Sequence, residues 1–246
     1  MKKTNWLIWI GFTAVSAGLR AWQTLAGYEA GGLAKRGFVP GILLLFVLLA
    51  SAVCFAVRAR SLPGKRADAF RLSEDFRFAD NLPAVLLAVT GSFLVLLGGG
   101  LYVLRALGSL APMLLGLFAA VAAACGLYTV FALYRGDEVQ SLALLAPICA
   151  LVVFVVYVYR ADASDPVLAR TYIEILAVAA LTFSAAQRAA FVFGGSAMRC
   201  YVSVSEFAAL LALCAAAEEG TLARAALYIG CAAIELGFLA AAKPEE

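Results

Sequence analysis

Long apolar runs separated by short polar links recur along the whole chain. Each run is about 20 residues long, which is the length that an α-helix needs to cross roughly 30 Å of hydrocarbon at 1.5 Å per residue. Hydrophobic residues make up 64% of the 246 residues and charged residues 14%, whereas soluble domains have about 45–50% and about 25%. The sequence therefore predicts an all-α integral membrane protein with no soluble domain.

The runs predict a single polytopic domain over residues 1–246, a bundle of about eight transmembrane helices. The predicted spans are 5–26, 38–58, 83–105, 111–134, 140–159, 167–192, 197–217 and 221–242. Four of them begin near a proline (Pro40, Pro83, Pro112 and Pro166). This position is favourable because the first helical turn has no internal acceptor for an N–H group. A bundle of seven spans is the alternative.

The distribution of basic residues predicts the orientation. With a cytoplasmic N-terminus, about twice as many Lys and Arg residues fall on the inner side as on the outer side, and half of the inner ones lie in the loop after the second span. Cytoplasmic loops of membrane proteins carry such an excess. We expect a multi-pass protein of the cell membrane with both termini in the cytoplasm; seven spans would put the C-terminus outside.

The segment 59–82 is the only long polar stretch of the sequence. It is predicted to be a cytoplasmic loop. Its apolar residues Phe70, Leu72, Phe76 and Phe78 alternate with basic residues, which would also suit a short interfacial helix on anionic headgroups.

Several function classes are excluded by what the sequence lacks. It has no histidine, so His-dependent triads, H-E-x-x-H zinc sites and haem ligation by histidine are impossible. The net charge is only +3 and no basic stripe occurs, which argues against a nucleic-acid partner. The six cysteines form no C-x-x-C pair. We therefore expect no enzymatic activity, no metal and no cofactor.

Five ionisable residues fall inside the predicted spans: Arg20, Glu174, Arg188, Glu206 and Glu235. Each costs at least about 2.5–3.5 kcal/mol at mid-membrane, so such residues are candidates for function. Depth along the helices predicts two ion pairs, Arg20 with Glu174 in the outer half and Arg188 with Glu235 near the inner side.

This pairing leaves Glu206 without an opposite charge. Ser203 lies about 60° from Glu206 around the helix and can share a site with it, whereas Ser205 points elsewhere; Tyr201 lies near the inner end of the same helix. A carboxyl group there would bind a cation or hold a proton, because transfer out of water disfavours its charge. Alternatively it would be a structural residue that pins helices together.

These residues predict a binding site between the first, sixth, seventh and eighth spans. Its members are Glu206, Ser203, Tyr201, Arg188, Glu235, Arg20 and Glu174. We expect a membrane protein that binds or transports a small solute, ion, cation or proton. The alternative is a non-catalytic structural or accessory subunit that packs with a partner or with itself as a homo-oligomer.

Two observations would separate these functions. A cavity deep in the membrane, lined by Glu206 and Arg188, would favour binding or transport. A dry bundle with an apolar groove on its outer face would favour the accessory role. Ridges of small residues, such as Gly116, Ala120 and Ala124 or Ala226 and Gly230, indicate close helix packing within the chain, and dimerisation is the second interpretation.

The stretch DPVLARTYIEILAVAALTFSAAQRAAFVFGG, from Asp165 to Gly195, has a Tyr-x-Glu entry and a Phe-Gly-Gly exit. It resembles uncharacterised multi-spanning membrane proteins of anaerobic Gram-positive bacteria. The resemblance implies a bacterial inner membrane location and contributes no site residues.

Overall fold

The computed structural model describes residues 3–28, 35, 39–62, 72–105, 109–162, 168–193, 195, 197–217 and 221–242. In these ranges the chain is mainly helical and contains no strand; Phe76 and Ala242 form an isolated antiparallel bridge. The helices are α1 (Lys3–Ala26), α2 (Val39–Ala59), α3 (Leu72–Asp75), α4 (Leu82–Arg105), α5 (Leu110–Arg135), α6 (Ser141–Asp162), α7 (Leu168–Val192), α8 (Met198–Ala216) and α9 (Leu222–Ala241). The predicted all-α bundle is confirmed.

Each predicted span corresponds to one long helix of the structure, and the boundaries agree to within a few residues. The span expected at 83–105, for example, is α4 (Leu82–Arg105), with Pro83 in its first turn. Pro166 lies outside the described residues. Seven of the long helices, α2 and α4 to α9, are apolar and long enough to cross a membrane. The remaining one, α1, is 24 residues long and more polar, because it carries Asn5, Arg20 and Gln23.

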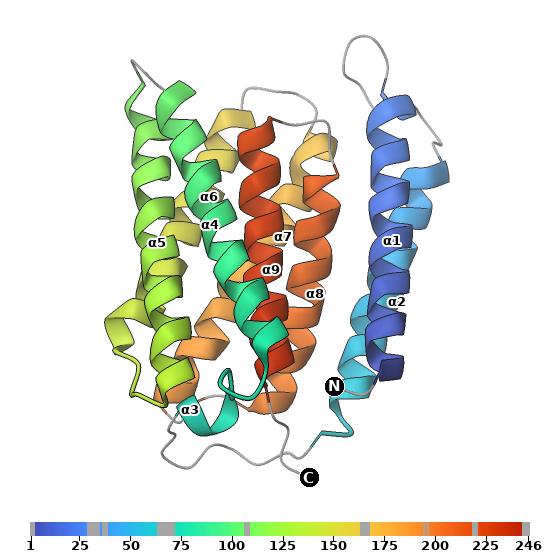
Figure 1. Ribbon diagram of the computed structural model, residues 1–246. Coiled ribbons are helices and arrows are strands. Elements are labelled where there is room, and N and C mark those ends of the chain that lie inside the picture. Colours follow the sequence, from blue (N-terminus) through green and yellow to red (C-terminus); the bar gives the residue numbers. More distant parts are fainter. Residues whose placement is uncertain are drawn as a thin grey trace.

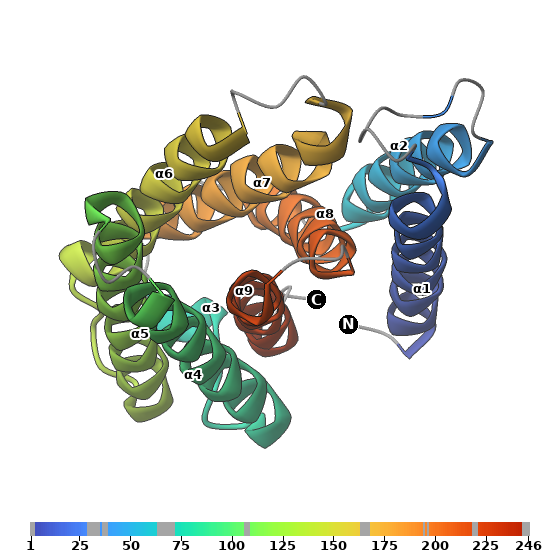
Figure 2. The ribbon, with the colours of Figure 1, turned by 90° about the horizontal axis from the view of Figure 1, so that it is seen from above.

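Six helices form a ring in chain order. Each of α4 to α8 packs on the next helix, and α9 returns to pack on α4. Figure 2 shows this arrangement from above, with α9 toward its middle. Helices α1 and α2 form an antiparallel hairpin at the side of the ring, where both contact α8 (Figures 1 and 2). The ring is therefore the body of the molecule, and the hairpin is attached to one of its helices.

Small residues bring α4 and α9 into backbone contact. A Cβ atom built on Gly91 would lie 2.6 Å from the carbonyl oxygen of Gly230, and one on Gly230 would lie 2.7 Å from that of Gly91. Such close approach is the usual basis of helix association in lipid, where the hydrophobic effect is absent. The sequence predicts that its ridges of small residues serve packing within the chain. This is confirmed for Gly230 and for Gly116, which approaches Gly99 of α4.

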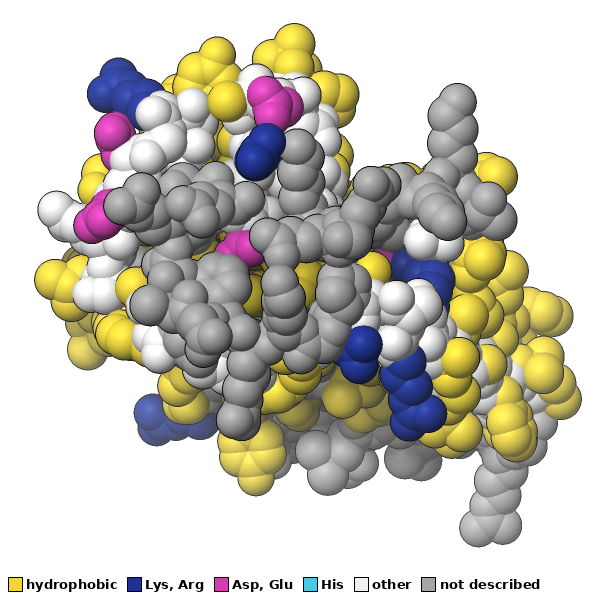
Figure 3. All heavy atoms as spheres, turned by 90° about the horizontal axis from the view of Figure 1, so that it is seen from below, with side chains coloured by type: hydrophobic (Ala, Val, Ile, Leu, Met, Phe, Trp, Pro, Cys, Tyr) yellow, Lys and Arg dark blue, Asp and Glu magenta, His cyan; other side chains and the backbone are white. Residues whose placement is uncertain are grey.

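Helix α1 begins and α9 ends at the same end of the bundle, which we call the base; the other end is the top (Figure 1). At the base the segment from Leu72 to Asn81 folds under the ring. The backbone N–H of Arg77 donates to the carbonyl of Ala241 at 3.0 Å, and the Asn81 amide donates to that of Ala240 at 2.8 Å. Charged side chains occur on this face, whereas hydrophobic side chains cover the visible flanks of the helices (Figure 3).

The apolar residues of this segment are buried under the ring. Leu72, Phe76 and Phe78 are all buried, and the Phe76 ring makes edge-to-face contacts with Phe191, Tyr201 and Phe238 at 5.4–5.7 Å. As an interfacial helix the segment would place these side chains against headgroups; instead they close the base of the ring. Phe70 and most of the loop lie outside the described residues.

Candidate functional site

A buried polar network joins α7, α8 and α9 in the base half of the ring. Arg188 of α7 and Glu235 of α9 form an ion pair at 3.2 Å, as predicted from their depths. The other carboxylate oxygen of Glu235 accepts a hydrogen bond from the Ser184 hydroxyl at 2.7 Å, and Ser184 lies 2.5 Å from the Ser205 hydroxyl. The guanidinium of Arg188 also lies 4.2 Å from the centre of the Phe238 ring. Both oxygens of the Glu235 carboxylate are thus bonded, which a charge away from water requires.

This network faces a cavity inside the ring. The cavity has a volume of about 70 Å³ and is bounded by residues of α4, α5, α6, α7 and α9. Arg188 and Glu235 are its charged lining residues, and Pro147 of α6 and Cys231 of α9 also line it. A proline inside a helix leaves one carbonyl without its usual intrahelical donor. The cavity therefore combines a buried ion pair with mostly apolar walls.

A second ion pair joins α7 and α9 nearer the top. Arg224 donates to the Glu174 carboxylate at 3.3 and 3.4 Å, and the Tyr228 hydroxyl donates to it at 3.4 Å. Glu174 therefore has Arg224 as an ionic partner, which depth along the helices did not predict, and the predicted Arg20–Glu174 pair stays a prediction. In α7, Glu174 lies nearer the top than Arg188. In the parallel helix α9 the order of charges is reversed, because Arg224 lies nearer the top than Glu235. The two ion pairs thus fix α7 against α9 at two depths.

Arg20 nevertheless approaches α7 from the hairpin. It is fully buried, its guanidinium lies 5.8 Å from the centre of the Tyr172 ring, and it donates to the side chain of Gln23 at 3.0 Å. The predicted contact between the first and sixth spans therefore exists at this depth. Tyr172, two residues before Glu174, takes part in it.

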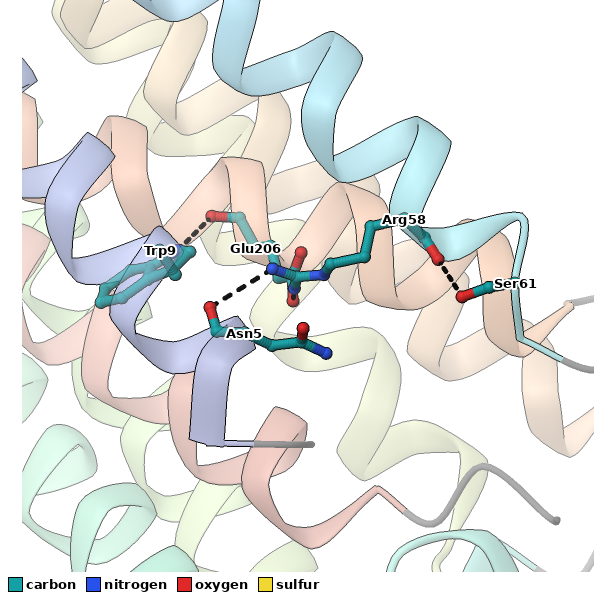
Figure 4. Close-up of polar contacts among 5 residues, drawn as sticks. All are labelled: Asn5, Trp9, Arg58, Ser61 and Glu206. Atoms are coloured by element: carbon teal, nitrogen blue, oxygen red, sulfur yellow. Dashed lines mark hydrogen bonds and ion pairs between the residues drawn. The ribbon is translucent and has the colours of Figure 1, made fainter.

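Glu206 has an ionic partner, contrary to the expectation that it would be left alone. Its carboxylate pairs with Arg58, which is near the end of α2 (Figure 4). Glu206 is 1% exposed and Arg58 17% exposed. Arg58 also donates to the backbone carbonyl of Asn5 at 3.3 Å, and the Trp9 indole donates to that of Glu206 at 2.9 Å. These contacts join α1, α2 and α8 at the base.

The remaining predicted site residues belong to different surroundings. Ser203 does not join Glu206 in the described structure and donates instead to the carbonyl of Cys200 at 3.1 Å. Ser205 points away from Glu206, as expected, and joins the network of Glu235. Tyr201 lies beside Arg188 and Ser205. The seven predicted residues therefore do not form one site, and the cluster that faces the cavity contains Arg188 and Glu235.

Sequence reasoning missed three residues, Arg58, Arg224 and Ser184. Both arginines lie within two residues of a helix end, so their positions in the sequence predict charges that face the loops. A long arginine side chain can instead extend along its helix toward the bundle interior. Ser184 lies four residues before Arg188 and so on the same helix face, which is a signal that could have identified it.

No group of three or more Cys, Asp or Glu residues that could hold a metal ion occurs among the described residues. Comparison with protein-family models, with curated proteins and with solved structures found no match to this chain.

Proposed function

We propose that the protein binds and transports a proton or a small solute in the cavity of the six-helix ring, with Arg188 and Glu235 as the binding groups. The observation that carries this proposal is the position of the ion pair, which lines a cavity in the membrane interior. A purely structural pair gains nothing from adjacent empty space, whereas a binding pair needs it.

The chemistry of the network suits reversible protonation. A proton that reaches the carboxylate of Glu235 neutralises it and releases Arg188, which is then available to an anionic group or to water in the cavity. Ser184 and Ser205 form a hydroxyl relay beside the carboxylate. The volume of about 70 Å³ has room for water molecules, each of which needs about 10–15 Å³ by this type of measure. A proton is therefore the species that fits the cavity as it stands.

Proton flux into liposomes tests the proposal. Liposomes that contain the purified protein and the pH-sensitive dye pyranine would be acidified from outside, with K⁺ and valinomycin present to remove the membrane potential. We expect faster acidification than in empty liposomes, and Glu235→Gln should return the rate to that of empty liposomes. Glu174→Gln is the matched control, because Glu174 belongs to the ion pair that does not line the cavity.

Ser184→Ala provides a second variant that keeps the ion pair. It should slow the flux without abolishing it, and size-exclusion chromatography would show that each variant is folded. Flux equal to that of empty liposomes for the folded parent protein, or equal flux in the parent and Glu235→Gln, would reject the proposal. The accessory role would then be preferred.

The location in a bacterial cell membrane, with the base in the cytoplasm, is part of the proposal. Arg58, Arg60, Arg77, Arg135 and Arg199 all lie at the base. Over the whole sequence about twice as many Lys and Arg residues fall on this side of the predicted spans as on the other, and the positive-inside rule assigns such an excess to the cytoplasmic side.

A further inference from the structure

We infer that helix α1 is a dimerisation surface, on which α1 of a second copy of this chain packs in parallel. The inference is independent of the proposed transport and rests on the hairpin, not on the cavity. Four features of α1 support it: its composition, its outer face, the groove beside it and a buried hydroxyl group.

Helix α1 is less apolar than the other long helices and is packed against few of them. It is the one long helix among those described that is not apolar enough to be recognised as a membrane span. It also lies at the periphery, where it packs on α2 and on α8 (Figure 2). Helix α1 therefore has one side against lipid, which a protein partner would cover.

The outer face of α1 consists of small residues between larger apolar ones. Leu7, Gly11, Ala14, Gly18 and Trp22 are all exposed, and their spacing of three or four residues puts them on one side of the helix. A Cβ atom on Gly11 or Gly18 would meet no atom within 4 Å. Among the described residues these glycines thus have no packing partner, unlike Gly91 and Gly230. The Ala14-x-x-x-Gly18 spacing is one that lets a second helix approach closely.

A groove of about 420 Å³ runs beside this face, between α1 and the neighbouring helices α8 and α9. Among the residues that line it are Thr13, Ala14, Ala17, Leu213, Ala216 and Ile229. Ala14 belongs both to the groove and to the outer face. A helix packed on the outer face would therefore also cover the groove.

Thr13 provides an independent indication that the groove is incomplete. It is 9% exposed, and the described residues offer its hydroxyl group no hydrogen-bond partner. Other threonines inside helices behave differently: Thr90, Thr129 and Thr182 each donate to the carbonyl four residues earlier at 2.7–2.8 Å, and Thr24 donates to the carbonyl three residues earlier at 2.9 Å. A buried hydroxyl without a partner beside an apolar groove is unfavourable, and rotation of the Thr13 side chain toward the groove would let a polar group of a docked helix satisfy it.

Charge favours a second copy as the occupant. In a parallel pair related by a twofold axis along the membrane normal, each exposed residue of α1 faces its own counterpart. Any exposed charge would then meet a like charge. Between Leu7 and Leu25 the outer face carries no charged residue, because Arg20, the one charged residue in that stretch, is buried. The same small ridge on both copies is self-complementary.

Dimerisation can be measured by energy transfer between donor- and acceptor-labelled copies of the full chain, reconstituted in liposomes at decreasing protein-to-lipid ratios. We expect the parent to form dimers and Gly18→Leu to remain monomeric, because a leucine side chain would separate the two helices. Gly100→Leu is the matched control: Gly100 is an exposed glycine of α4 that also has open space at its Cβ position, and its variant should dimerise like the parent.

Two further variants keep the inference testable if Gly18→Leu fails to fold. Thr13→Val should weaken the dimer about threefold, the typical effect of one interhelical hydrogen bond in a membrane. In a background without cysteine, Gly18→Cys should form a disulfide between copies and Gly100→Cys should not. A parent protein that is monomeric at every ratio would overturn the inference and assign the groove to lipid acyl chains. Dimers that survive Gly18→Leu would place the interface elsewhere and overturn it equally.

Discussion

Arg58 on α2 and Glu206 on α8 form an ion pair that attaches the α1–α2 hairpin to the six-helix ring. Glu206 is buried, and its backbone carbonyl accepts the Trp9 indole N–H from α1. Glu206 therefore contacts both helices of the hairpin. It lies on α8, which is the helix of the ring that the hairpin mainly packs on.

The Arg58–Glu206 pair should control how firmly the hairpin is held. Glu206→Gln removes the charge at nearly constant size and should cost about 1.5–3 kcal/mol, the usual contribution of a hydrogen bond to a charged group. Hydrogen exchange measured by mass spectrometry should become faster in α1 and α2 and stay unchanged in α4 to α7. Asp80→Asn is the control, because Asp80 pairs with Arg77 at 3.9 Å on the exposed base and such pairs contribute little. Equal exchange in both variants would contradict the prediction.

The Arg188–Glu235 pair should show strong coupling in a double-mutant cycle. Arg188→Met or Glu235→Gln alone leaves a buried charge or dipole without its partner and should cost roughly 3–5 kcal/mol, whereas the double variant should cost less than the sum. Equilibrium unfolding in mixed micelles measures these differences. Strictly additive effects would show that the two side chains do not depend on each other.

Phe76 should be essential for closing the base of the ring. Its side chain is fully buried against Phe191, Tyr201 and Phe238, so Phe76→Ala should lower the free energy of unfolding by about 3–5 kcal/mol. Phe93→Ala is the control on α4, because Phe93 is 56% exposed on the outer surface. Unfolding in the same micelles should show a small effect for Phe93→Ala, and similar losses for both variants would refute the role of Phe76.

The orientation of the bundle can be tested with single cysteines in a background without native cysteine. Asp80 is exposed at the base and Arg105 is exposed at the top end of α4. In intact cells an impermeant thiol reagent should label Arg105→Cys, and it should label Asp80→Cys only after the cells are opened. The reverse pattern would place the base outside the cell.

The sequence by itself determined where the long helices lie and that they are apolar. Length and apolar composition are local properties, and a backbone in hydrocarbon must satisfy its hydrogen bonds within each helix, so α4 and α5 could be placed to within one or two residues. Depth along a helix is also local, which is why the Arg188–Glu235 pair could be predicted from residue positions.

Only the tertiary structure decided which helices are neighbours, and hence which charges meet. Arg224 lies at a depth from which Glu174 is accessible, but only the packing of α9 close to α7 at that point shows that it bonds Glu174. Arg20 comes from α1 and reaches the same helix at Tyr172. Arg58 could not be assigned to Glu206 for a related reason: its backbone lies near a helix end, and only the packing of α2 on α8 directs its side chain inward. Depth is one coordinate of a residue in a bundle. The helix rotation and the identity of the facing helix are the others, and both arise from contacts between segments distant in sequence.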